Sequence, residues 1–327
     1  MKKSLLLSMA VGALGLAVAA PAQAQNLRGE IKIDGSSTVF PITEAVAEEF
    51  QDKYPNVRVT VGVSGTGGGF KRFVKGETDI SNASRPIKSK EDKATQDAGI
   101  EYIEIPVAYD GLTIVVNKRN YWVDNLTVDE LKSIFLEDSA KSTWSEVRDG
   151  WPDIPIRIYS PGTDSGTFDY FKEVIAGKTG TIRGDMSVSE DDNVLVRGVS
   201  GEEGAIGFFG CAYYFENADK LKGVPIDGGN GPVSPKVETI ADGSYAPFSR
   251  PLFVYVNSRS AKKREIREFV NFYLDNAAEL SAEVGYVGLP DSVYERAARN
   301  FKRLKTGTFF LDDKGEKVHG PLEEVFK

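Results

Sequence analysis

The sequence predicts an α/β fold made of two lobes, and three observations support this prediction. Short β-branched runs alternate with helix-type patterns, which is typical of an α/β fold with a largely parallel sheet. The chain has 327 residues, enough for two domains of the usual ~100–200 residues. Two long apolar runs, residues 111–117 and 250–257, both end in Val-Asn and enclose residues 118–249, which have strand and helix patterns of their own. One lobe is therefore expected to be inserted into the other.

The individual elements follow from the spacing of the apolar residues. Residues 57–63 carry valine at every second position, the period of a strand. Ile42, Val46 and Phe50 recur at helical spacing and predict a helix over residues 41–54. By the same criteria we expect strands at 30–34, 78–81, 102–108, 111–117, 154–159 and 250–257, and helices that carry Phe70 to Val74, at 128–135, at 168–176 and through 266–274.

The position of the two long apolar runs defines the expected lobes. Lobe I is predicted to consist of residues 25–109 and 252–327, and lobe II of residues 110–251. Two strands would cross between the lobes. Because clefts between domains are the preferred place for small ligands, we expect the ligand cleft between the lobes.

Residues 1–24 have the pattern of a secretory signal peptide. Lys2 and Lys3 form a basic start, residues 5–20 are apolar, and Ala22-Gln23-Ala24 supplies a cleavage motif. The alternative is an N-terminal membrane anchor, which the short apolar stretch disfavours. No later stretch is apolar for the ~20 residues that a spanning helix needs. We therefore expect an exported, soluble protein that is cleaved near Ala24.

Composition excludes several classes of function. Acidic residues outnumber basic ones 48 to 40, for a net charge of −8, so a general nucleic-acid binder is not expected. With one cysteine and one histidine, the chain forms no internal disulfide and no His/Cys zinc cluster. A hydrolase with a histidine base would have to use His319. We expect no cofactor, no metal and no enzyme activity.

Three polar, glycine-bearing turns each precede a helical pattern: residues 34–38, 64–69 and 162–167. The first amides of a helix lack backbone partners and carry the positive end of its dipole, while Ser and Thr hydroxyls add donors. Three such turns that face one cleft would bind a small oxyanion. Each turn alone is equally explained as a helix cap or a tight turn. None matches a Rossmann or Walker fingerprint.

Seven motifs together resemble a known family over essentially all of the chain after residue 24. The chain resembles the periplasmic phosphate-binding component of the bacterial phosphate ABC transporter (PstS/SphX type). The resemblance implies the two-lobed, hinged fold of periplasmic binding proteins (type II), and a receptor, expected to be monomeric, that delivers phosphate to membrane permease subunits. The motifs are Gly35-Ser-Ser-Thr-Val-Phe-Pro41, Ser64-Gly-Thr-Gly-Gly-Gly-Phe70, Ser81-Asn-Ala-Ser-Arg-Pro86, Leu126-Thr-Val-Asp-Glu-Leu131, Asp164-Ser-Gly-Thr167, Gly204-Ala-Ile-Gly-Phe208 and Leu289-Pro-Asp-Ser-Val293.

The resemblance also implies which residues contact the anion. Donors are expected from the first loop, from the second loop, from the segment around Ser84, and from the middle lobe, which closes over the ligand. In order along the chain these are Thr38 and the Val39 amide, Ser64 with Thr66 as a further donor, Ser84, and Ser165, Gly166 and Thr167.

Two departures from the family pattern bear on specificity. Arg85 stands where many members have an Asp that accepts the proton of phosphate, and Pro161 stands where many have an Arg. We expect Arg85 to take over the charged contact, since its planar fork bonds two oxygens. Asp164 is the proposed proton acceptor, although it could equally be an N-cap. The alternative for Arg85 is a surface salt bridge.

Other functions remain open from the sequence alone. One keeps the fold and changes the ligand to another tetrahedral oxyanion, such as sulfate, molybdate or arsenate. Others are a secreted phosphatase and a role in adhesion or sensing at the cell surface. Phosphate carries a proton at neutral pH and sulfate does not, so a buried carboxylate in the pocket would favour phosphate and repel sulfate.

Overall fold

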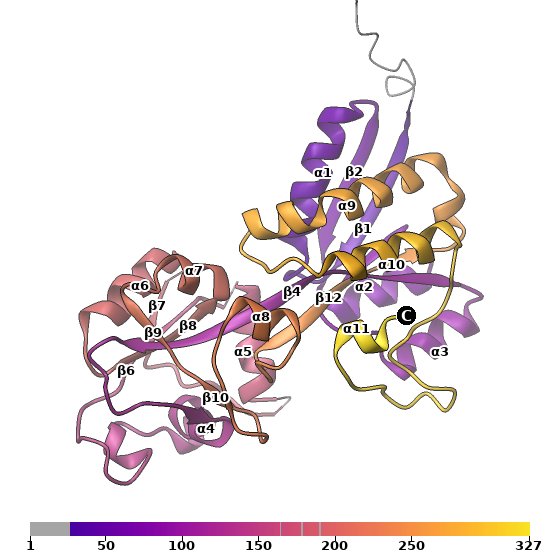
Figure 1. Cartoon of the computed structure of the whole chain (residues 1–327). Helices are drawn as coiled ribbons and strands as arrows, with labels where there is room; N and C mark the ends of the chain where they lie inside the picture. Colours follow the sequence, from indigo (N-terminus) through magenta and orange to yellow (C-terminus); the bar gives the residue numbers. More distant parts are fainter. Residues whose placement is uncertain (1–26, 164, 178, 190) are drawn as a thin grey trace, which may run out of the picture.

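The structure is a computed structural model and describes residues 27–163, 165–177, 179–189 and 191–327. The predicted signal segment 1–24 and the predicted acceptor Asp164 lie outside the described residues. Within them, no helix has the length and apolar character needed to cross a bilayer. The mixed α/β, two-lobed architecture predicted from the sequence is confirmed, and Figure 1 shows the lobes on either side of two long strands.

One sheet runs through both lobes. Its lobe I part begins with three parallel strands, and two antiparallel strands, β12 and β4, connect them to the strands of lobe II. β9 (Leu221–Gly223) pairs with β4 off the main path. The order across the sheet is β2 (Val57–Val63), β1 (Gly29–Gly35), β3 (Ile80–Ala83), β12 (Ser249–Asn257), β4 (Tyr102–Asn117), β8 (Ala205–Gly210), β6 (Arg157–Ser160) and β7 (Ser187–Val188).

The sixteen residues of β4 form one continuous, buried strand. Its first part, residues 102–111, pairs with β12, and residues 112–117 pair with β8 and β9. The sequence predicted two strands here, at 102–108 and 111–117, with residues 109–110 between them. That prediction was wrong because Asp110 is paired with Arg250 of β12, and a side chain at Gly111 would meet Ile240 and Cys211 within 2.9 Å. These residues mark tight packing and not a chain break.

The helices of lobe I lie around β1 to β3. In α1, Phe50 packs edge-on against Phe269 of α9, with 5.2 Å between the ring centroids. α2 begins at Gly65, earlier than the helix predicted to follow Gly69. The first turns of α2 pack directly against β1, and only glycine fits at residue 69, because a Cβ there would lie 2.6 Å from the Cα of Gly35. The helices are α1 (Phe40–Lys53), α2 (Gly65–Val74), α3 (Ser89–Asp97), α9 (Arg264–Glu283), α10 (Asp291–Lys302) and α11 (Leu322–Val325).

Lobe II has its own apolar core and a small second sheet. Phe171 of α5 stacks on Phe208 of β8 with 3.8 Å between the ring centroids. The Thr127–Glu130 capping box begins α4. The helices are α4 (Val128–Phe135), α5 (Gly166–Ile175), α6 (Asp192–Gly201), α7 (Cys211–Glu216) and α8 (Val237–Ala241), and the small sheet has the order β11 (Pro232–Val233), β10 (Ile226–Asp227) and β5 (Leu126–Thr127).

The chain passes from lobe I to lobe II in β4 and returns in β12. After β12, the chain adds α9, α10 and the C-terminal segment to lobe I (Figure 1). The boundaries predicted at 109/110 and 251/252 fall inside these two strands. A site between the lobes therefore has β4 and β12 as its connecting elements.

Candidate functional site

The first predicted loop lies between β1 and α1. Gly35 ends β1 against β3, where a Cβ would meet the carbonyl oxygen of Asn82 at 2.2 Å. The Ser36 hydroxyl then accepts the Thr38 N–H at 3.2 Å, which fixes the turn. Thr38 and Val39 are buried, and the Val39 N–H has no hydrogen-bond partner in the described part of the chain. A free amide at a helix start is suited to an anion.

The second loop holds Ser64 at the start of α2. Its hydroxyl donates to the buried Asp34 carboxylate, whose other oxygen accepts from Arg72 at 2.8 Å. Asp34 therefore anchors the turn to β1. Ser64 would have to turn its hydroxyl away from Asp34 in order to donate to an anion.

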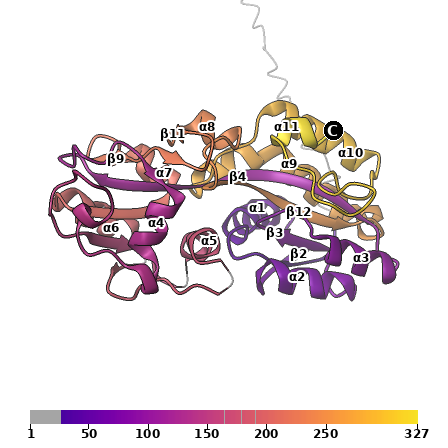
Figure 2. The same ribbon diagram turned by 90° about the horizontal axis from the view of Figure 1, so that it is seen from below.

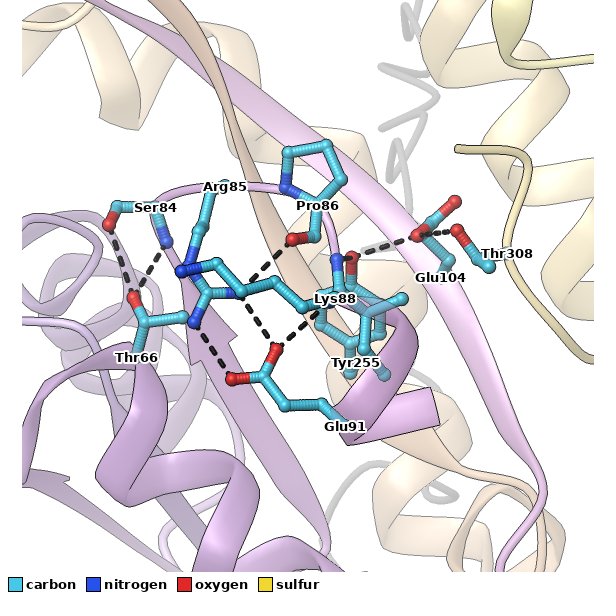
Figure 3. Close-up of polar contacts among 10 residues, drawn as sticks. Thr66, Ser84, Arg85, Pro86, Lys88, Glu91, Glu104, Tyr255 and Thr308 are labelled. Atoms are coloured by element: carbon cyan, nitrogen blue, oxygen red, sulfur yellow. Dashed lines mark hydrogen bonds and ion pairs between the residues drawn. The ribbon is translucent and has the colours of Figure 1, made fainter. Parts of the chain in front are cut away.

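The predicted residues Thr66 and Ser84 lie together. Their hydroxyl oxygens are 3.1 Å apart, and Thr66 Oγ1 also accepts the Ser84 N–H at 3.1 Å (Figure 3). The end of β3 is thus held against the first turn of α2. This contact joins two of the segments that the sequence assigned to the site.

Arg85 is bound to a carboxylate of its own lobe. Its two terminal nitrogens donate to the two oxygens of Glu91 at 2.8 Å each, and Nη1 also donates to the Pro86 carbonyl (Figure 3). The guanidinium lies 5.9 Å from the centroid of the Phe70 ring. Burial would raise the pKa of Glu91, but Arg85 and the Lys88 N–H outweigh it and the pKa is lowered. The fork predicted to hold an oxyanion is occupied by Glu91 in this structure.

Lobe II contributes the amino end of α5. Ser165 caps this helix by accepting the Thr167 N–H at 3.2 Å. A Cβ at Gly166 would lie 3.1 Å from Thr38 Oγ1, so α5 and the first loop are in direct contact across the two lobes. Figure 2 shows α5 beside α1. Thr38 and Gly166, which are predicted from opposite lobes, are therefore brought together.

Arg250 is the residue at this junction that the sequence analysis did not assign. It lies at the start of β12, with only 13% of its side chain exposed. Its Nε donates to Asp110 of β4 at 3.1 Å, and Nη2 donates to Thr38 Oγ1 at 3.3 Å. The guanidinium also lies over the ring of Tyr170, 3.6 Å from its centroid. A cation is thus held where the two lobes meet.

Carboxylates hold Arg250 in this position. Asp110 is fully buried, and burial raises its pKa even though Arg250 pulls it down. Glu173 of α5 accepts from Nη1 at 3.4 Å. The one sequence signal for this cluster was a pair of charged residues, Asp110 and Arg250, within two long apolar strands. Their pairing depends on strand register, which a single sequence does not give.

The arrangement supplies hydrogen-bond donors and one cation for a small oxyanion. The donors come from the first loop, from the Thr66–Ser84 pair and from the α5 terminus, and the cation from Arg250. Among the described residues, no group of three or more His, Cys, Asp or Glu side chains could hold a metal. The chemistry that these residues offer is charge-assisted hydrogen bonding.

Comparisons with known proteins place this chain in a family. A family model described as PBP superfamily domain matches residues 20–277. Protein SphX of Synechococcus elongatus is 54% identical over 93% of this chain and 90% of its own length. Phosphate-binding protein PstS of Staphylococcus haemolyticus is 40% identical over 85% of this chain and 87% of its own.

The structural comparison agrees with the sequence comparison. The crystal structure of a possible phosphate binding protein from Planctomyces limnophilus has a TM-score of 0.82 and 48% identity, and the match covers 85% of this chain and 99% of that one. The resemblance stated from the sequence motifs is confirmed. The chain belongs to the PBP superfamily, among the relatives of the SphX and PstS proteins.

Proposed function

We propose that this protein binds inorganic phosphate between its two lobes and delivers it to the permease of a phosphate ABC transporter. The names of relatives at 40% identity and above support phosphate as the ligand. The motif resemblance supports the transporter. The proposal includes an exported, periplasmic, monomeric receptor that lacks catalytic activity.

The observation that carries the proposal is the meeting of Thr38, Gly166 and Arg250. Thr38 belongs to lobe I, Gly166 to lobe II, and Arg250 to a strand that crosses between them. An anion bound at this point would contact both lobes at once. It would favour the closed arrangement by the contacts that only this arrangement makes. The permease would then recognise the closed form.

The proposed contacts come from four segments and one strand. Arg250 supplies the positive charge beside the α5 terminus. Arg85 is a second proposed cation that has to leave Glu91 before it can bind the ligand. The remaining proposed contacts are Thr38, Val39, Ser64, Thr66, Ser84, Ser165, Gly166 and Thr167, with Asp164 as the proton acceptor.

We propose that the two lobes that close on the ligand have the boundaries predicted from the sequence. Lobe I comprises residues 25–109 and 252–327, and lobe II residues 110–251. Both boundaries lie in β4 and β12. Small backbone changes in two neighbouring strands would then be enough to open and close the site.

Isothermal titration tests the function directly. Protein that has been unfolded, stripped of ligand and refolded is titrated with phosphate, alone and in excess sulfate. We expect tight one-to-one binding of phosphate that sulfate leaves unchanged. Competition by sulfate, or no heat with phosphate, would instead favour a receptor for another oxyanion. An assay with a chromogenic phosphate monoester tests the absence of phosphatase activity.

A further inference from the structure

A second group of basic side chains surrounds a separate cavity on lobe I. The cavity has a volume of about 240 Å³, and three distant parts of the chain form it. These are the loop 85–88 before α3, Pro251 in β12, and the C-terminal segment with Phe310 and residues 317–320. Of the residues proposed to contact phosphate, only Arg85 also lines this cavity, and Thr38, the α5 terminus and Arg250 do not.

Three basic side chains line the cavity without an ion pair to a carboxylate among the described residues. These are Lys88, Lys317 and His319, whose side chains have no hydrogen bond or ion pair within the described residues, while Glu91 and Glu173 lie close enough to Lys88 to favour its charge. None of the lining residues is Asp or Glu. Arg85 also lines the cavity, but Glu91 holds its guanidinium. In a chain of net charge −8 this is a local concentration of cations.

The same three side chains also border a neighbouring hollow. This hollow has a volume of about 710 Å³ and adds Lys90 and one carboxylate, Glu316. Burial, and then the nearby Arg85 guanidinium, lower the pKa of Lys88. A lysine in such surroundings becomes easier to keep charged when an anion binds next to it. The positive electrostatic potential at the cavity therefore favours binding of an anion.

We propose that this cavity is a second anion site, which binds a diphosphate anion through Lys88, Lys317 and His319. These side chains present N–H donors from two segments, as recognition of a tetrahedral oxyanion requires. A water takes up about 30 Å³ in the liquid, so a cavity of this size has room for two linked phosphoryl groups. The probe that matches both its size and its charge is inorganic pyrophosphate.

The chain contains its own reporter for this site. His319 is the only histidine, so the imidazole signals of an untagged protein labelled with 13C-histidine arise from this residue alone. The protein is kept saturated with phosphate, which fills the site at Arg250, and is titrated with pyrophosphate at constant ionic strength. We expect a saturable shift of the His319 signal as pyrophosphate is added, because the anion binds next to the imidazole ring.

Substitutions distinguish specific binding of pyrophosphate in the cavity from nonspecific attraction to a positively charged surface. The variant with Lys88→Gln and Lys317→Gln should bind pyrophosphate about tenfold or more weakly, because it loses two charge-assisted contacts. Lys314→Gln is the matched control, since Lys314 lies on the same C-terminal segment and does not line either cavity. It should bind pyrophosphate as the wild type does. Phosphate titration of each variant checks that the site at Arg250 is intact.

Three results would overturn the proposal. The first is a His319 signal that does not move, or that moves linearly without saturation. The second is an equal shift when sodium sulfate at the same ionic strength replaces pyrophosphate. The third is a loss of affinity in Lys314→Gln that equals the loss in the double variant. Because phosphate binding at the first site is measured separately, failure here is distinguishable from failure of the proposed function.

Discussion

Arg250 donates a hydrogen bond of 3.3 Å to Thr38, a residue 212 positions away in the sequence. This bond ties the strand that returns from lobe II to the loop that begins α1 in lobe I. The α5 terminus of lobe II lies against the same Thr38 hydroxyl. Arg250 thus lies both in a strand that connects the lobes and beside the proposed site, so a ligand that replaced its bond to Thr38 would also act on the contact between the lobes.

Arg250→Lys should weaken phosphate binding by about 1.5–3 kcal/mol, which is roughly 10- to 100-fold. Lysine keeps the charge beside Asp110 but lacks the planar fork that reaches Asp110 and Thr38 together. Isothermal titration with phosphate measures the loss. The melting temperature of the ligand-free variant checks that the fold is kept.

The matched control for this substitution is Arg259→Lys, which lies just beyond the other end of β12. Its guanidinium is exposed and donates to the Gly99 carbonyl at 3.1 Å. We expect no change in phosphate affinity. A second test replaces the whole pair, with Arg250→Met and Asp110→Asn, so that no buried charge is left unpaired. If both Arg250 variants bound phosphate with wild-type affinity, Arg250 would not be part of the phosphate site.

Arg85→Ala should weaken phosphate binding less than Arg250→Lys does. The Arg85 fork already has two bonds of 2.8 Å to Glu91, so binding phosphate exchanges one charged partner for another and gains little. We expect a loss below about tenfold, or 1.4 kcal/mol. Titration of both variants under the same conditions gives the ranking. A loss in Arg85→Ala that equals or exceeds the loss in Arg250→Lys would make Arg85 the principal cation.

Sequence patterns predicted the local parts of the site and missed the part built from distant residues. Ser165 was assigned from the turn before a helix, and it caps α5 as such a turn implies. Strand β2 spans residues 57–63, as its alternating valines predicted. Arg250 was missed because its role depends on the register that places it opposite Asp110. Long-range pairing is not encoded in the spacing of neighbouring residues, so the pairing of Asp110 with Arg250 was not predicted.

Gly166→Ala should weaken phosphate binding roughly tenfold without loss of stability. The added methyl group would lie 3.1 Å from Thr38 Oγ1, closer than carbon and oxygen normally pack, so the lobes would be held apart. Overpacking of this kind costs about 1–3 kcal/mol. Alanine itself favours the helix, so the ligand-free melting temperature should not fall. The measurements are phosphate titration and thermal unfolding.

Gly201→Ala is the control for that variant. Gly201 ends α6 in the same lobe, and a Cβ there would meet nothing within 4 Å. Its phosphate affinity should equal that of the wild type. If Gly166→Ala also binds normally, then contact between α5 and the first loop is not needed for binding.

Asp164→Asn should allow sulfate to compete with phosphate. A carboxylate accepts the proton that phosphate still carries at neutral pH, and it repels the fully ionised sulfate by like charge. The amide removes the repulsion. Phosphate titration in excess sulfate, on the wild type and the variant, measures the change. Asp169→Asn in the first turn of α5 is the control for loss of one carboxylate, and unchanged selectivity in Asp164→Asn would discard Asp164 as the acceptor.

Glu104 gives the protein a dependence of stability on pH that is separate from the ligand. This buried carboxylate of β4 accepts from Tyr255 at 2.8 Å and from Thr308 at 2.7 Å (Figure 3). It also accepts from the Phe309 N–H at 3.0 Å. Burial raises the pKa of Glu104 from 4.5 to about 7, although its three donors pull it down. The folded protein therefore binds the proton more tightly than the unfolded chain does.

The free energy of unfolding contributed by Glu104 should thus be highest below pH 4.5 and should fall as the pH rises to about 7. The difference is roughly 3.5 kcal/mol at 1.4 kcal/mol per pKa unit. Urea unfolding at a series of pH values, on the wild type and on Glu104→Gln, isolates this term. The variant should lack the fall between pH 4.5 and 7, whereas Glu101→Gln, at an exposed carboxylate nearby, should keep it. Parallel pH profiles for the wild type and Glu104→Gln would mean that the Glu104 carboxyl keeps its ordinary pKa in the fold. In that case the three donors, and not burial, would determine its charge.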